Sequence, residues 1–207
     1  GINEQDYAWM DEGWASFFDY LLSDSLSAHQ QGRVRAYSAI AGTENDVPPM
    51  VRSRNLSAAY RNASYQRPQN AYFTLLDLLG YDTFHKCMTE YMDRWKGKHP
   101  APFDFFNTWN DVSGQNLDWF WRAWFFEWGY PELGIRDVIK DVTGSRQVVT
   151  IVRKGNIPVP VRRVHIAQQA FHMVEQVAHG AVLGVGDALR AGRGGPELCD
   201  VAHGLGD

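Results

Sequence analysis

The sequence has few cysteines, no long apolar run and no large excess of either charge. Its two cysteines, Cys87 and Cys199, are too few and too far apart for a disulfide framework or a cysteine-rich zinc site. No stretch reaches the roughly 18 apolar residues of a membrane-spanning helix. The formal net charge of -4 gives no basic surplus for electrostatic capture of nucleic acid. We therefore expect no nucleic-acid partner and no membrane span in this chain.

Apolar periodicity predicts that the first part of the chain is helical. The 207 residues are 44% hydrophobic, enough for one ordinary domain or for one domain and part of a second. Residues 42 to 64 favour a loop with at most one short helix, because proline, glycine and asparagine interrupt the pattern. Spacings of three and four between apolar residues, with proline and glycine at the ends, predict helices over 9–26, 68–79, 82–95, 104–112 and 117–128.

Tryptophan is concentrated in this helical part, with six of the eight residues between Trp95 and Trp128. Such density also occurs in platforms that stack sugars or bases. Helical spacing nevertheless favours packing in a core, where aromatic side chains bury the most area. Cys87 falls on the same apolar pattern, so we expect a buried thiol.

The pattern changes after Gly134. Residues 148–152 are β-branched, residues 154–156 predict a turn, and residues 157–166 predict a second strand at a sheet edge because it contains two prolines. Residues 180–207 contain eight glycines and no apolar alternation. We expect this tail to be either the product of a frame change in the coding sequence or a divergent terminus.

Two short motifs carry the chemistry, and the first is Trp9, Asp11, Glu12 and Gly13 at the start of the predicted helix. Alone, Glu12 would be interpreted as a solvated carboxylate near a helix N-terminus. In its order and spacing the segment resembles the region of aminopeptidase N-type gluzincin zinc metallopeptidases that supplies their third zinc ligand. The resemblance implies that Glu12 binds zinc beside two histidines of an HExxH motif.

The second motif is Tyr65-Gln66-Arg67-Pro68, which leads into a leucine-rich helix. A lone tyrosine would be interpreted as a packing residue. The motif is similar to the family segment whose tyrosine stabilises the oxyanion, which implies that Tyr65 is catalytic. Its phenol would donate a hydrogen bond where charge develops, a contribution of about 3 kcal/mol per donor.

The resemblance covers about residues 1–165 and implies a fold as well as a reaction. The chain is expected to be mainly α, with the helical lobe of a thermolysin-like catalytic domain over residues 1–134. Residues 135–207 would form a β-rich segment with the start of a β-sandwich domain and the atypical glycine-rich tail. The implied reaction is hydrolysis of the N-terminal bond of peptide substrates with one zinc ion in the intact enzyme.

The sequence departs from the family pattern because it contains no HExxH motif. Counted back from Glu12 at the family's spacing, that motif would lie before Gly1, so we expect a fragment truncated after it, inactive alone and without retained zinc. His165, His172 and His179 do not replace it and are interpreted as incidental. The alternative function is a non-catalytic helical module that binds a peptide or glycan. Residue preference, localisation and oligomeric state stay open.

Overall fold

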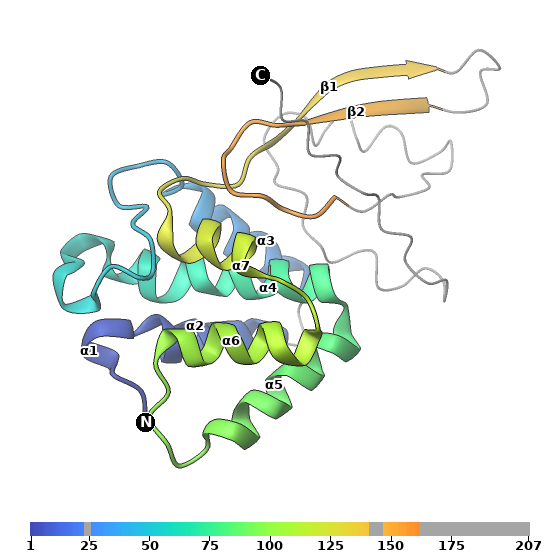
Figure 1. Ribbon diagram of the computed structural model, residues 1–207. Helices are drawn as coiled ribbons and strands as arrows, with labels where there is room; N and C mark the ends of the chain where they lie inside the picture. Colours follow the sequence, from blue (N-terminus) through green and yellow to red (C-terminus); the bar gives the residue numbers. More distant parts are fainter. Residues whose placement is uncertain (23–25, 141–146, 162–207) are drawn as a thin grey trace, which may run out of the picture.

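The computed structural model describes residues 1–22, 26–140 and 147–161, and these form a helical body followed by a hairpin (Figure 1). The helices of the body are α1 (Glu4–Tyr7), α2 (Trp9–Leu21), α3 (Leu26–Ser38), α4 (Arg67–Leu79), α5 (Tyr81–Trp95), α6 (Pro102–Ser113) and α7 (Asp118–Trp121). Shorter turns are the 3₁₀ segments η1 (Ser53–Asn55) and η2 (Ser57–Ala59) and the π-helices η3 (Asn62–Gln66) and η4 (Arg122–Phe126). The hairpin consists of β1 (Leu133–Lys140) and β2 (Gln147–Arg153). The expectation of a mainly α fold is confirmed.

An aromatic core holds the helices of the body together. Trp9 of α2 stacks on Phe106 of α6, with ring centroids 5.5 Å apart and an angle of 9° between the planes. Trp14 of α2 stacks on Tyr72 of α4 at 3.9 Å. Aromatic side chains are suited to this role because each buries a large area and pairs with its neighbours. The largest fully buried side chains include Trp9, Trp109, Trp124, Tyr72, Phe17, Phe105, Phe120 and Phe125.

The predicted core roles of tryptophan and of Cys87 are confirmed in the main. Trp9, Trp109, Trp121 and Trp124 are buried, and so is the Cys87 thiol, whose pKa is raised by burial to about 11. The exceptions are two tryptophans that lie at the surface, Trp119 and Trp128.

The helix ends follow the proline and glycine signals in the sequence. In α6, Pro102 begins the helix, the Asp104 carboxylate accepts a hydrogen bond from the Ala101 backbone N–H at 2.8 Å, and Gly114 ends it in the left-handed conformation. The helices predicted over 68–79, 82–95 and 104–112 are thereby confirmed.

Other predicted boundaries were wrong. The first helix, expected to reach residue 26, ends at Leu21, and α3 was not predicted. Residues 53–64, part of the range 42–64 that was expected to be largely loop, consist mostly of short helical turns. The helix predicted to run to residue 128 becomes the π-helix η4 and ends at Phe126.

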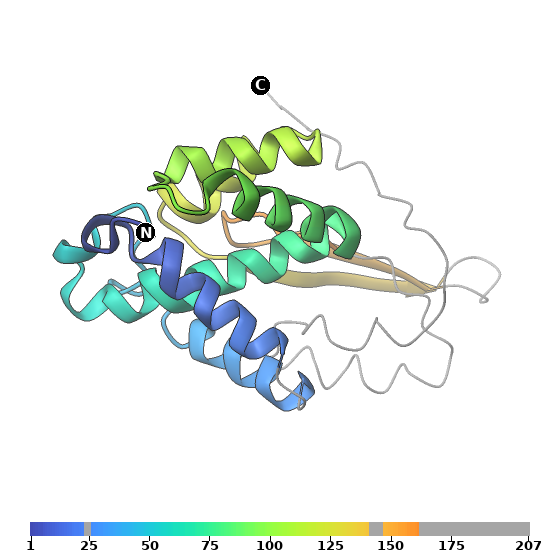
Figure 2. The ribbon, with the colours of Figure 1, turned by 90° about the horizontal axis from the view of Figure 1, so that it is seen from below.

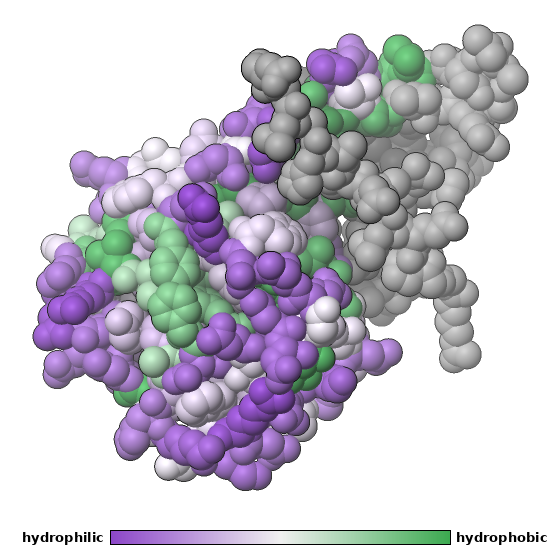
Figure 3. Space-filling model, in the orientation of Figure 1, coloured by the Kyte–Doolittle hydropathy of each residue, from purple (hydrophilic) through white to green (hydrophobic). Residues whose placement is uncertain are grey.

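The β1–β2 hairpin extends away from the helical body (Figures 1 and 2). The strands pair antiparallel, with Ile135 opposite Ile151 and Val138 opposite Val149, and one irregularity lies between the two pairs. These apolar side chains are partly exposed, so hydrophobic residues reach the surface of the hairpin (Figure 3).

The segment after β2 returns to the helical body. Residues 157–161 form no strand, so the prediction of a second strand beginning at Ile157 was wrong for these residues. Instead, Ile157 is 1% exposed and belongs to the aromatic core. Its backbone N–H donates to the Tyr130 carbonyl at 3.3 Å. The rest of that predicted strand, the three histidines and the glycine-rich tail lie outside the described residues.

None of the helices within the described ranges combines the length and the apolar character needed to cross a lipid bilayer.

Candidate metal and catalytic site

Glu12 and Tyr65, the two candidate site residues, come from different elements and meet in the structure. Glu12 lies in the first turn of α2, and Tyr65 lies in the π-helix η3 that runs directly into α4. The Tyr65 hydroxyl donates a hydrogen bond to the Glu12 carboxylate, with 2.5 Å between Oη and Oε1. Both side chains are half-buried. Two residues separated by 53 positions in the sequence are therefore in direct contact.

Close packing of α2 against α4 makes this contact possible. A Cβ added at Gly13 would lie 2.9 Å from Pro68 Cβ and 3.1 Å from the Tyr72 ring, so only glycine allows this approach. One turn further along α2, the Gln69 amide donates to the Ser16 carbonyl at 2.8 Å. The residue after Glu12 thus fixes how near the two helices come.

The hydrogen bond to Glu12 sets the ionisation of Tyr65. It is the largest cause that raises the pKa of the Tyr65 phenol to about 12, ahead of burial and of the negative charge on Glu12. The nearby Tyr60 ring, centred 6.1 Å from that of Tyr65, adds a smaller effect in the same direction. At neutral pH Tyr65 is therefore a neutral hydrogen-bond donor.

A shallow hollow is lined in part by Tyr60, whose ring lies near that of Tyr65. Its volume is about 290 Å³, and it is lined by Glu4, Gln5, Ser53, Arg54 and Tyr60. Tyr60 connects the hollow to the neighbourhood of Tyr65. Neither Glu12 nor Tyr65 is part of its lining.

Glu12 is an isolated candidate metal ligand within the described residues. These ranges contain no group of three or more histidine, cysteine, aspartate or glutamate side chains that could hold a metal ion. Since Tyr65 occupies Oε1, the other carboxylate oxygen of Glu12 keeps its lone pairs for a further partner. The donor type suits zinc, but the ligand number of a catalytic site is not reached.

Sequence reasoning missed the roles of three residues near Tyr65, which are Asp46, Asn62 and Arg67. Arg67 belongs to the second motif. Arg67 is completely buried and forms an ion pair with Asp46 at 3.2 Å. Asn62, at the start of η3, donates to the same carboxylate oxygen. Arg67, a charged residue inside the second motif, was the available signal, and its partner Asp46 lay in the segment expected to be a loop.

Residues 3–124 match the model of the peptidase family M1 domain. Leucine aminopeptidase 2 of Emericella nidulans is 23% identical over 169 residues, which are 68% of this chain and 26% of that protein. The Aspergillus fumigatus protein of the same name is 22% identical over 194 residues, 83% of this chain and 31% of its own length. Glutamyl aminopeptidase of Sus scrofa is 22% identical over 140 residues, 63% of this chain and 15% of that protein.

The chain thus spans at most about a third of these curated relatives. The family match covers more than half of the 207 residues and includes both candidate site residues. The chain belongs to peptidase family M1.

Proposed function

We propose that this chain supplies a metal-binding glutamate, Glu12, and a catalytic tyrosine, Tyr65, to an aminopeptidase that uses zinc and hydrolyses the N-terminal bond of peptides. The observation that carries the proposal is the 2.5 Å contact between Tyr65 Oη and Glu12 Oε1, inside the segment that matches the family. The names of the relatives, leucine and glutamyl aminopeptidase, support the reaction class.

Glu12 fits the zinc as one ligand of three. A catalytic zinc takes three protein ligands and keeps one open position, and carboxylate oxygen is one of its usual donors. The remaining ligands would be the histidines of an HExxH motif, which the 207-residue sequence does not contain. When bound, zinc supplies Lewis acidity and an activated water. We propose that this chain alone neither retains zinc nor hydrolyses peptides.

Tyr65 would act as the donor to the oxyanion. Its phenol stays protonated at neutral pH because its pKa is raised to about 12. Because a phenol has one proton, Tyr65 would exchange its bond to Glu12 for one to the carbonyl oxygen of a bound peptide, where negative charge develops as the bond is attacked. Donors of this kind contribute about 3 kcal/mol to transition-state stabilisation.

We further propose the division of the chain into a helical part of the catalytic domain, residues 1–134, and a β-rich segment from residue 135 on. The change from helices to the hairpin at Leu133 supports this division. The alternative, a module that binds peptides or glycans through exposed aromatic residues and the 42–64 loop, is not favoured, because most of the described aromatic rings pack in the core.

A chimera tests the proposal in an active enzyme. Residues 1–134 would replace the matching segment of the Emericella nidulans leucine aminopeptidase 2. The peptidase activity of this chimera would be measured with leucine anilide as the substrate. Tyr65→Phe should lower kcat by about 10²–10³-fold with little change in KM, because the donor acts in the transition state. Glu12→Gln should lower the zinc content after dialysis.

Tyr60→Phe is the matched control, since its ring lies beside Tyr65, whereas the hydrogen bond to Glu12 comes from the Tyr65 hydroxyl. It should leave both kcat and zinc content unchanged. An unchanged kcat in zinc-loaded Tyr65→Phe chimera would remove the catalytic role of Tyr65. The unmodified 207-residue chain, dialysed and assayed beside the chimera, should show neither zinc nor activity.

A further inference from the structure

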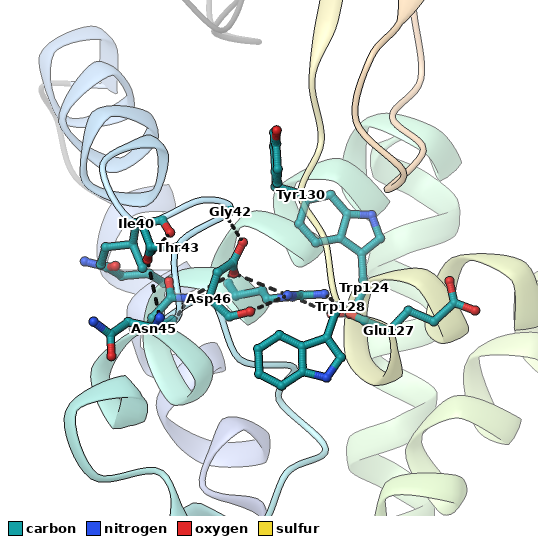
Figure 4. Close-up of polar contacts among 12 residues, drawn as sticks. Ile40, Gly42, Thr43, Asn45, Asp46, Trp124, Glu127, Trp128 and Tyr130 are labelled. Atoms are coloured by element: carbon teal, nitrogen blue, oxygen red, sulfur yellow. Dashed lines mark hydrogen bonds and ion pairs between the residues drawn. The ribbon is translucent and has the colours of Figure 1, made fainter.

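One buried carboxylate is bonded to both ends of the π-helix that carries Tyr65. Arg67 follows directly after η3, and its Nη1 lies 3.2 Å from Asp46 Oδ1. Asn62 is the first residue of η3, and its Nδ2 lies 3.1 Å from the same oxygen. The other oxygen, Oδ2, accepts the Gly42 backbone N–H at 3.0 Å (Figure 4). The Asp46 carboxylate therefore joins a loop to the start and the end of η3.

The guanidinium of Arg67 extends this network to the second π-helix. Its Nε donates to the Trp124 carbonyl at 2.9 Å, and its Nη2 donates to those of Ala123 at 3.3 Å and Glu127 at 2.6 Å. Together with Asp46 these partners use the donors of a side chain that is 0% exposed. Figure 4 shows Asp46 facing the segment of Trp124 and Glu127. The network thus fixes η3 against η4.

The register of η3 decides where the Tyr65 side chain points. The Arg67 backbone N–H donates to the Asn62 carbonyl, a bond that spans five residues where an α-helix spans four. Such a wide turn is rare and needs support from its surroundings. A change of one residue in helical register turns a side chain by roughly 100° about the helix axis. Relaxation of η3 to α-helical geometry would therefore turn Tyr65 away from Glu12.

We propose that Asp46 is a positioning residue that, through Asn62 and Arg67, holds η3 in the register that brings the Tyr65 hydroxyl to Glu12. Asp46 itself lies among loop residues and is 2% exposed, so it acts only through its partners. Its significance for catalysis rests on the proposed function, whereas the placement of the Tyr65 hydroxyl can be measured without any activity.

The test is an NMR measurement on the full 207-residue chain labelled with [4-¹³C]tyrosine at neutral pH. Tyr65→Phe assigns the Tyr65 signal, and Glu12→Ala shows where that signal moves when the acceptor is lost. Asp46→Asn keeps the size of the side chain and removes its charge beside Arg67. It should move the Tyr65 signal in the same direction as Glu12→Ala and by a comparable amount.

Two control variants separate positioning from general effects. Glu44→Gln removes an exposed acid from the same loop and should leave the Tyr65 signal in place. Ile157→Ala weakens the core without touching the network and should lower the unfolding midpoint while the Tyr65 signal stays fixed. A shift of the same size in Ile157→Ala would show that the signal follows stability, and the positioning role would be lost.

A folded Asp46→Asn chain with an unchanged Tyr65 signal overturns the proposal. Should Asp46→Asn not fold, Asn62→Ala decides, because it removes the bonds from the Asn62 amide to Asp46 and to the Asn45 carbonyl and leaves the Arg67–Asp46 pair. A smaller shift in the same direction supports the proposal, and an unmoved signal refutes it. In the chimera, loss of kcat in Tyr65→Phe together with an unmoved signal in Asp46→Asn would reject the positioning role while the proposed function stands.

Discussion

A buried charge that loses its partner destabilises a protein strongly. Asp46→Ala would leave the Arg67 guanidinium in the core, 0% exposed, without its carboxylate. Breaking such a pair from one side costs about 3–5 kcal/mol because the remaining charge stays desolvated. We expect the free energy of unfolding, measured by urea denaturation, to fall by that order.

The Asp6–Arg54 ion pair provides the comparison at the surface, since the Arg54 side chain is half exposed. Arg54→Ala should hardly move the urea midpoint, because water replaces the lost partner. If the two substitutions shifted the midpoint equally, the burial of Arg67 would not govern the energetics of its ion pair.

At this scale the sequence predicted Glu12 and Tyr65 as candidate site residues but not the residues that hold them. Both were found through order and spacing that resemble a family, and the structure adds that they touch. Asp46 could not be found in this way, because its role depends on the fold bringing a loop to both ends of η3. A carboxylate between glycine and prolines has the appearance of an ordinary turn residue.

At the scale of elements, Gly13 determines how closely α2 approaches α4. Gly13→Ala should gain up to about 1 kcal/mol in helix propensity. The new methyl would, however, lie 2.9 Å from Pro68 Cβ, in a ring fixed by its own backbone. Overpacking of this kind costs about 1–3 kcal/mol, so we expect a net loss of stability in thermal unfolding.

Gly32→Ala is the matched control within a helix, because nothing lies within 4 Å of the position that its Cβ would occupy. It should stabilise the chain by about 0.5–1 kcal/mol, through helix propensity alone. The two substitutions therefore have opposite signs. A stabilising Gly13→Ala would mean that α2 and α4 can separate without cost and that their contact does not fix the distance from Glu12 to Tyr65.

Elements were predictable where local signals agree with the fold. Helix α6 begins at a proline and ends at a left-handed glycine, and both signals are in the sequence. Helix α3 has only a weak apolar face, so no periodicity marked it. The π-helices η3 and η4 were beyond prediction, since one extra residue in a turn is set by tertiary bonds such as those of Arg67.

For the whole molecule, the segment beyond the hairpin is part of the helical body's core. Two hydrogen bonds connect the turn after β2 to the segment that precedes β1. The Lys154 N–H donates to the Glu132 carbonyl at 2.8 Å, and the Asn156 side-chain amide donates to the Trp128 carbonyl at 2.6 Å. Ile157 then enters the aromatic core. The change in sequence pattern near residue 134 marks where helices end, yet packing crosses that point.

Truncation measures how much the stability of the helical body depends on the residues that follow β2. We expect a chain of residues 1–134 to be less stable than one of residues 1–161 by about 2–5 kcal/mol, the range for loss of a buried isoleucine side chain. Ile157→Ala within residues 1–161 should account for most of the difference, as measured by urea unfolding followed through tryptophan fluorescence. Val161→Ala, at an exposed position in the same segment, serves as the control and should leave the midpoint in place. Equal urea midpoints for the two truncated chains would show instead that residues 1–134 fold as an independent unit. Ile157 would then contact the core without adding to its stability.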